Sequence, residues 1–153
     1  MRGLVATVAV VCALATACEV EDQVESMSPQ RDLAVFTADI QPFIGSGCGS
    51  LDCHGDPGRP LRLYARFGLR KSAALRHEPA SDEELVANVA AFAALPVERL
   101  LGKPLAIDAG GLKHVGGDLW ATPAVPAYRC LQAWLEGDTD TAACAAAVAA
   151  APY

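Results

Sequence analysis

The sequence predicts a small, mostly α-helical domain. Apolar residues recur at spacings of three and four in several segments, as they do on one face of an amphipathic helix. Ser81 and Glu84 have the spacing of a helix capping box, in which each side chain bonds to the other residue's backbone N–H. No stretch alternates apolar and polar residues for long enough to predict a β-strand. The length of 153 residues is that of one domain.

The first predicted helix covers residues 31–45. Its apolar residues fall on one helix face: Leu33, Phe36, Ile40, Phe43 and Ile44. Pro42 predicts a kink or a restart, because proline lacks a backbone N–H and crowds the preceding turn. Gly45 and Gly47 predict where the helix stops.

Residues 56–70 carry glycine and proline breakers and predict an extended or looping segment. We expect its large apolar side chains to pack inward: Leu61, Leu63, Tyr64 and Phe67. The second main helix covers residues 81–95, starts at the Ser81 capping box and ends before Pro96. Its apolar stripe consists of Leu85, Val89 and Phe92.

The second half of the chain predicts a short helix, a loop and a last main helix. Residues 97–108 form the short helix, which Gly102 and Pro104 interrupt. Residues 109–120 form a glycine-rich loop around His114. The last main helix lies within residues 122–137, and its core-facing side chains are Tyr128, Leu131, Trp134 and Leu135.

The N-terminus predicts export to the bacterial cell envelope. Residues 1–17 have the features of a signal peptide: Arg2, an apolar run too short to span a bilayer comfortably, and small residues before Cys18. The end of this segment resembles a lipobox, which would make Cys18 the lipidated N-terminus and anchor the protein to a membrane. Simple cleavage after an A-x-A site remains the alternative. Residues 18–31 are acidic and poor in large apolar residues, so we expect a disordered tether.

The charge excludes one class of partner. The formal net charge is −6, and loss of Arg2 with the signal peptide makes it more negative. Nucleic-acid-binding proteins use basic patches, so nucleic acid is not expected as a partner. An acidic surface suits solubility and can steer a basic protein partner.

Four of the six cysteines remain for structure or chemistry once Cys12 and Cys18 are assigned to the N-terminal segment. In an oxidising compartment, Cys130 and Cys144 form a natural disulfide, because a short, turn-like loop separates them. This bond would hold the Ala-rich C-terminal segment 138–153 on the preceding helix. Cys48 and Cys53 are left as a second pair.

The stretch "CGSLDCH", residues 48–54, fits three chemistries. A covalent haem needs two thiols and an adjacent histidine, although the usual spacing is Cys-x-x-Cys-His. A zinc ion is a second possibility, with Cys48, Cys53, His54 and His114 as tetrahedral ligands. The adjacency of Cys53 and His54 makes that chelate awkward. A Cys48–Cys53 disulfide in a haem-less accessory or binding lipoprotein is the third.

Longer stretches resemble a known family. "FTADIQPFIGSGCGSLDCHG" resembles the opening of small class-I-like c-type cytochromes, with a wider CxxxxCH spacing. "LLGKPLAIDAGGLKHVGGDLW" followed by "YRCLQAWLEG" resembles the cytochrome-c-like domains of planctomycete and myxobacterial envelope lipoproteins. The resemblance covers residues 32–137. It implies one covalent haem c packed between the first and last helices, thioether bonds from Cys48 and Cys53, and His54 as the proximal iron ligand.

The sixth iron ligand is expected to be a second histidine. Cytochromes of this type often use methionine, but the chain has only Met1 and Met27, both ahead of the domain. His114 is the better candidate because the surrounding glycines let the backbone approach the face of the haem ring, whereas His77 is expected on the surface. Two filled axial positions favour single-electron transfer to redox protein partners over catalysis, so an enzyme is not expected. We also expect folding to depend on the haem, which would otherwise leave a cavity.

Overall fold

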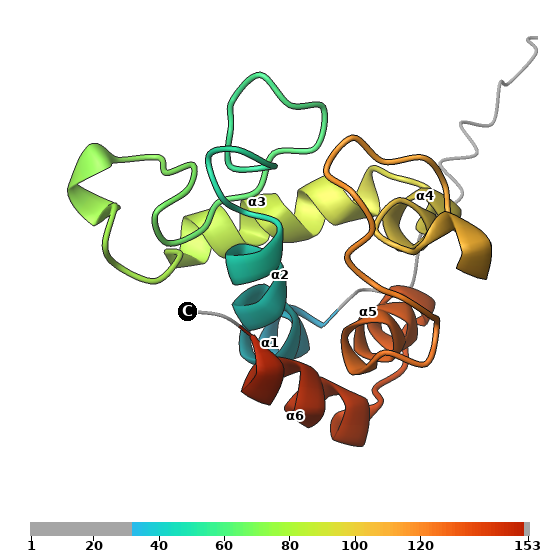
Figure 1. Ribbon diagram of the computed structural model, residues 1–153. Coiled ribbons are helices and arrows are strands. Elements are labelled where there is room, and N and C mark those ends of the chain that lie inside the picture. The colour runs from blue at the N-terminus through green and yellow to red at the C-terminus, as the bar shows by residue number, and fades with distance from the viewer. Residues whose placement is uncertain (1–31, 152–153) are drawn as a thin grey trace, which may run out of the picture.

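The structure is a computed structural model that describes residues 32–151. The predicted signal peptide (1–17), the predicted lipidation site Cys18 and the predicted tether (18–31) lie outside the described residues. The described part is mostly helical, which confirms the predicted fold class (Figure 1). Its β-pairing is limited to two isolated bridges, Tyr64 with Leu69 and Leu105 with Trp120. No helix among residues 32–151 has the length and apolar character needed to cross a membrane.

The first helical run is continuous but changes its winding just before Pro42, where a kink or restart was predicted. It consists of α1 (Leu33–Val35), the π-helical η1 (Phe36–Ile40) and α2 (Gln41–Gly47). The wider π turn lets the Gln41 N–H bond to the carbonyl of Phe36, directly before Pro42, which has no N–H to donate. The predicted restart is therefore a π segment, and the run ends at Gly47 as expected.

The three other predicted helices follow in order, and the Ala-rich segment forms a further helix that was not predicted. The helix α3 (Asp82–Ala93) begins with the predicted capping box of Ser81 and Glu84. After it come α4 (Val97–Gly102), α5 (Pro126–Glu136) and α6 (Thr141–Ala150). Two short 3₁₀ turns lie in the loops: η2 (Ala73–Leu75) and η3 (Ile107–Ala109). Gly137 ends α5 with a φ of 81°, a left-handed conformation that glycine adopts without strain.

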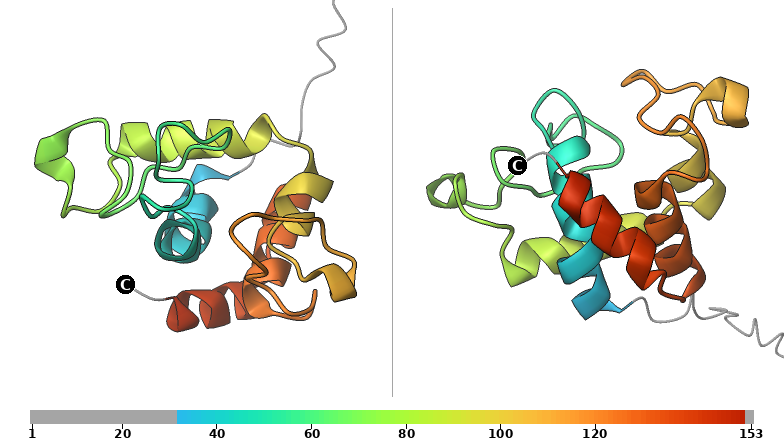
Figure 2. Two further views of the ribbon diagram at one scale, coloured as in Figure 1. Left: turned by 45° about the horizontal axis from the view of Figure 1, so that its top comes forward. Right: turned by 60° about the horizontal axis from the view of Figure 1, so that its bottom comes forward.

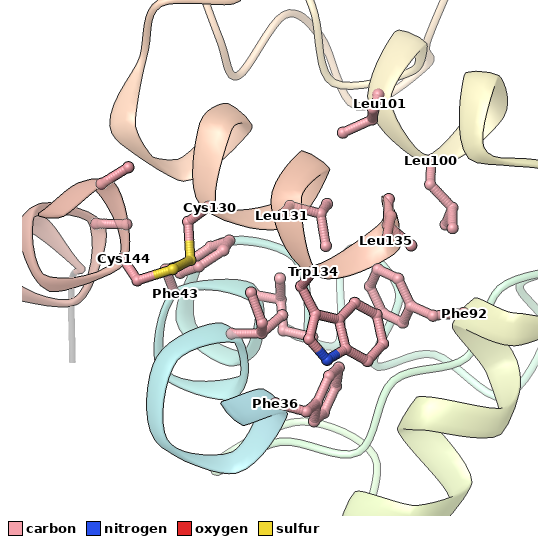
Figure 3. Packing of buried hydrophobic residues seen from close by; sticks show 14 of the residues in the cluster. Phe36, Phe43, Phe92, Leu100, Leu101, Cys130, Leu131, Trp134, Leu135 and Cys144 are labelled. Atoms are coloured by element: carbon pink, nitrogen blue, oxygen red, sulfur yellow. A yellow bond between two sulfur atoms is a disulfide. The ribbon is translucent and has the colours of Figure 1, made fainter. Parts of the chain in front are cut away.

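Three aromatic rings form the centre of the hydrophobic core (Figure 3). The Phe36 ring centroid lies 5.1 Å from that of Trp134 and 5.9 Å from that of Phe92. Phe36 and Trp134 belong to the first helical run and to α5, so these helices touch directly. Aromatic side chains therefore fill this contact between the first helical run and α5.

The predicted Cys130–Cys144 disulfide is present, with a sulfur–sulfur distance of 2.01 Å. It joins α5 to α6, which crosses the first helical run (Figure 2). Ala143, Cys144 and Ala147 are buried in the same core as the aromatic rings. The Ala-rich segment is thus part of the main packing unit, and its small side chains allow close helix contact.

Two long loops lie together on one side of the molecule. In Figure 1, the loop that follows α2 and the upper part of the loop between α4 and α5 lie on the side of the molecule away from α6. A buried amide fixes the first of these loops: Asn88 of α3 accepts from the Tyr64 N–H and donates to the Tyr64 carbonyl, both at 2.8 Å. Leu63 is buried as predicted, but Phe67 is 46% exposed, which contradicts the expectation that it packs inward.

Candidate functional site

The two loops bring His54 and His114 together. Their ring planes differ by only 6°, and the ring centroids lie 6.0 Å apart. His77 lies elsewhere, with its ring centroid 5.3 Å from that of Phe67. Of the two histidines considered as partners of His54, the structure therefore pairs His54 with His114.

Both imidazoles are held in the same way by the backbone. The His54 Nδ1 lies 2.9 Å from the carbonyl oxygen of Leu61, and the His114 Nδ1 lies 3.1 Å from that of Gly117. A carbonyl oxygen only accepts hydrogen bonds, so each Nδ1 must carry the proton and donate. In the neutral form of such a ring, Nε2 carries the lone pair that can bind a metal. This is the arrangement typical of metal-ligating histidines, whose second nitrogen donates to a backbone carbonyl.

The turn that carries His54 is tight and depends on glycine. The His54 N–H donates to the Cys48 carbonyl at 2.9 Å, so the four intervening residues of the CxxxxCH stretch fold back on themselves. A Cβ atom at Gly49 would lie 2.6 Å from the Cβ of Ala65, and one at Gly55 would lie 2.1 Å from the Gly49 carbonyl oxygen. Both distances are shorter than real Cβ contacts, so a side chain at either position would displace the turn.

The loop that carries His114 is anchored at both sides of the histidine. Before it, the Leu112 N–H donates to the Gly102 carbonyl at 2.7 Å and the Lys103 Nζ donates to the Lys113 carbonyl at 2.7 Å. After it, a Cβ atom at Gly116 would lie 2.9 Å from Cε1 of the His114 ring. A side chain at Gly116 would therefore crowd the His114 ring.

Cys48 and Cys53 are near each other but are not bonded, and both are partly buried. Burial raises the pKa of the Cys48 thiol to about 12, and the neighbouring Cys53 adds to the rise. Cys48 is therefore a neutral thiol at pH 7. The thiolate is the form that attacks disulfides, so this environment disfavours disulfide exchange at Cys48.

The four proposed zinc ligands do not form a metal site. Within residues 32–151, no three side chains of His, Cys, Asp or Glu gather closely enough to hold an ion. The two histidines alone cannot complete the tetrahedral coordination of structural zinc. The zinc interpretation of Cys48, Cys53, His54 and His114 therefore has no geometric support in the described part of the chain.

Exposed apolar side chains occur in both histidine loops. Val115, next to His114, is 94% exposed, and three leucines are also exposed: Leu51, Leu112 and Leu119. Soluble domains rarely place several large apolar residues in the same exposed loops unless a ligand or partner covers them. Sequence analysis missed these residues and the two orienting carbonyls, because no local pattern shows which loop side chains stay outside the core.

Comparison with known proteins adds no assignment. No protein family matches the chain, and no curated protein or solved structure is similar to it.

Proposed function

We propose that the protein is a mono-haem c-type cytochrome that carries single electrons in the bacterial cell envelope, where a lipid at Cys18 anchors it to a membrane. His54 and His114 would be the two axial ligands of the iron. Cys48 and Cys53 would form the thioether bonds. The proposal rests mainly on one observation, the parallel pair of imidazoles with free Nε2 atoms.

The separation of the rings suits two ligands on opposite sides of one metal. A metal–imidazole bond is about 2 Å long, and the ring centre lies about 1 Å beyond the ligating nitrogen. Two histidines on opposite sides of an iron therefore have centroids about 6 Å apart, whereas a tetrahedral ion would bring them to about 5 Å. The observed centroid distance of 6.0 Å is closer to the first value than to the second.

The chain's own residues would set the properties of the site. A haem, when bound, supplies reversible one-electron iron chemistry. The carbonyls of Leu61 and Gly117 fix the orientation of the two rings. Two histidine ligands favour a lower reduction potential than a histidine–methionine pair, and they leave no coordination position for a substrate. These features support an electron carrier rather than an enzyme.

Two further features support a haem over a bare Cys48–Cys53 disulfide. The cysteines stay unbonded in the same structure that forms the Cys130–Cys144 disulfide. The exposed leucines and Val115 offer apolar surface beside the histidines, which a porphyrin needs. One observation favours the alternative, a haem-less accessory lipoprotein: the thiols of Cys48 and Cys53 are close enough to interact.

The test is a haem stain on a denaturing gel, with the full chain produced in a host that matures c-type cytochromes. Covalent haem survives denaturation, so the wild-type band should stain and show cytochrome absorption. His54→Ala should abolish the low-spin spectrum, and His114→Ala should convert it to a high-spin spectrum. His77→Ala is the matched control and should change neither. Unstained wild-type protein with Cys48 and Cys53 oxidised would refute the proposal and leave the disulfide-stapled lipoprotein.

A further inference from the structure

The segment 57–77 has a charge opposite to that of the whole chain. It holds six of the twelve Lys and Arg residues and no acidic residue, although the chain has a net charge of −6. The six are Arg59, Arg62, Arg66, Arg70, Lys71 and Arg76. The positive charge is therefore concentrated in one loop instead of being spread over the surface.

Only part of this charge is neutralised. Arg70 forms a buried salt bridge with Glu84, and Lys71 pairs with Glu83. The other four arginines of the segment are exposed, and none forms a salt bridge with another described residue. The loop thus presents a local positive field on an acidic protein.

An exposed aromatic ring lies at the centre of this loop. Phe67 has a φ of 62°, a left-handed conformation that a bulky residue rarely adopts. Its N–H donates to the Arg76 carbonyl at 3.0 Å, which holds the turn in place. The Arg66 guanidinium carbon lies 5.1 Å from the Phe67 ring centroid, and the His77 ring packs on the same phenylalanine. We call Arg66, Phe67, Arg76 and His77 the Phe67 cluster.

The Phe67 cluster adjoins the turn that carries the candidate site. A Cβ atom at Gly68 would lie 1.9 Å from the Gly49 carbonyl oxygen, so these two backbones are in direct contact. The same segment supplies the Leu61 carbonyl that binds His54 Nδ1. A molecule bound at the cluster would therefore sit against the Cys48–His54 turn.

We propose that the Phe67 cluster is the docking surface for a protein partner that presents an acidic patch around an apolar contact. Arginine and aromatic residues are the side chains that most often dominate binding energy at protein interfaces. Phe67 is exposed and has the Arg66 side chain beside it. A partner with an apolar residue surrounded by carboxylates would be complementary to this surface. The role of this partner as an electron donor or acceptor rests on the proposed function, but the binding itself does not need a haem. The charge of this loop favours an acidic partner at the cluster, whereas the net negative charge of the chain led us to expect a basic one.

The test measures binding of two labelled short peptides by fluorescence anisotropy, using the full chain. One peptide contains glutamates around two leucines, and the other has serines in place of the leucines. Both should bind despite the net negative charge of the chain, and the leucine peptide should bind more tightly. Raising the ionic strength from about 0.01 M to about 0.15 M shortens the Debye length from about 30 Å to about 8 Å and should weaken both.

Variants separate the cluster from the rest of the surface. Phe67→Ala should weaken binding of the leucine peptide about fivefold or more, so that it binds no more tightly than the serine peptide. Arg66→Glu should weaken both peptides, whereas Arg99→Glu, the same charge change at an exposed position in α4, should leave binding within about twofold. Equal effects of Arg66→Glu and Arg99→Glu would overturn the proposal. The proposal would also be overturned if neither peptide bound and the chain instead bound anionic lipid vesicles in a way that required Phe67. That result would assign the cluster to a membrane surface.

The outcome is independent of the haem stain. Peptide binding by a chain that does not stain would refute the cytochrome and leave the docking surface in place. A chain that is positive in the haem stain but binds neither peptide would refute the docking surface alone.

Discussion

The buried carboxylate of Glu84 should make the protein lose stability in acid, and glutamine at this position should remove that loss. The Glu84 side chain is fully buried. It accepts from the Arg70 guanidinium, with Nη2 at 2.7 Å, and from the backbone N–H groups of Lys71 at 2.8 Å and Ser81 at 2.9 Å. Burial alone would raise the pKa of Glu84, but these hydrogen bonds and the Arg70 charge lower it to about 2.

The sign and size of the effect follow from this pKa. The folded-state pKa of Glu84 lies below the ordinary value of 4.5, so the unfolded chain binds the proton more readily. The resulting stability is complete above pH 4.5 and is lost as the pH falls towards 2. A shift of this size corresponds to about 3 kcal/mol, of which about 2 kcal/mol is lost between pH 7 and pH 3.

Denaturant unfolding of wild type, Glu84→Gln and Glu83→Gln at pH 7 and pH 3 measures the effect. Glu84→Gln should be less stable at pH 7, and its free energy of unfolding should fall by about 2 kcal/mol less than that of wild type on acidification. Glu83, which forms an exposed pair with Lys71, is the matched control and should change stability by less than about 1 kcal/mol. Parallel pH dependences of wild type and Glu84→Gln would refute the assigned pKa.

Two further predictions concern the disulfide and the His114 loop. Replacing Cys130 and Cys144 by serine should lower the free energy of unfolding by about 3 kcal/mol, the chain-entropy estimate for a separation of 14 residues. Denaturant unfolding measures this loss. An unchanged midpoint would show that the packing of α6 needs no covalent bond. Gly116→Val should displace the His114 ring and so change the low-spin spectrum and the reduction potential of a bound haem. The control is Gly47→Val, because a Cβ atom there meets nothing within 4 Å. This control should leave the spectrum and the potential unchanged.

The helices other than α6 were predictable because local chemistry fixes them. The capping box of Ser81 and Glu84 satisfies backbone donors at the start of α3, and no other part of the fold is needed for that. Pro42 was recognised as a disturbance, but its form was not, because a π turn depends on how Phe36 and Ile40 are buried against the rest of the core.

The misplacement of Phe67 shows where sequence patterns stop. An apolar residue among leucines suggests burial, but residues 65–68 form a tight turn closed by the Gly68 N–H and the Ala65 carbonyl. Phe67 occupies the third position, where a positive φ is required and glycine or asparagine is usual. The pairing of His54 with His114 was predicted, but the orientation of their rings comes from the backbone carbonyls of Leu61 and Gly117. Every residue type has a backbone carbonyl, so the sequence carries no signal for these contacts.

The arrangement of the core changes what loss of the haem should do. From the sequence we expected the fold to depend on the haem, yet Phe36, Phe92 and Trp134 fill the contact between the first helical run and α5 themselves. His54 and His114 lie on loops outside these helices, so a haem there would cover loop surface rather than complete the core. His54→Ala should therefore lose the haem spectrum and retain the helical circular dichroism of the wild type. A disordered His54→Ala chain would show instead that the histidine loops need the haem in order to hold the helices together.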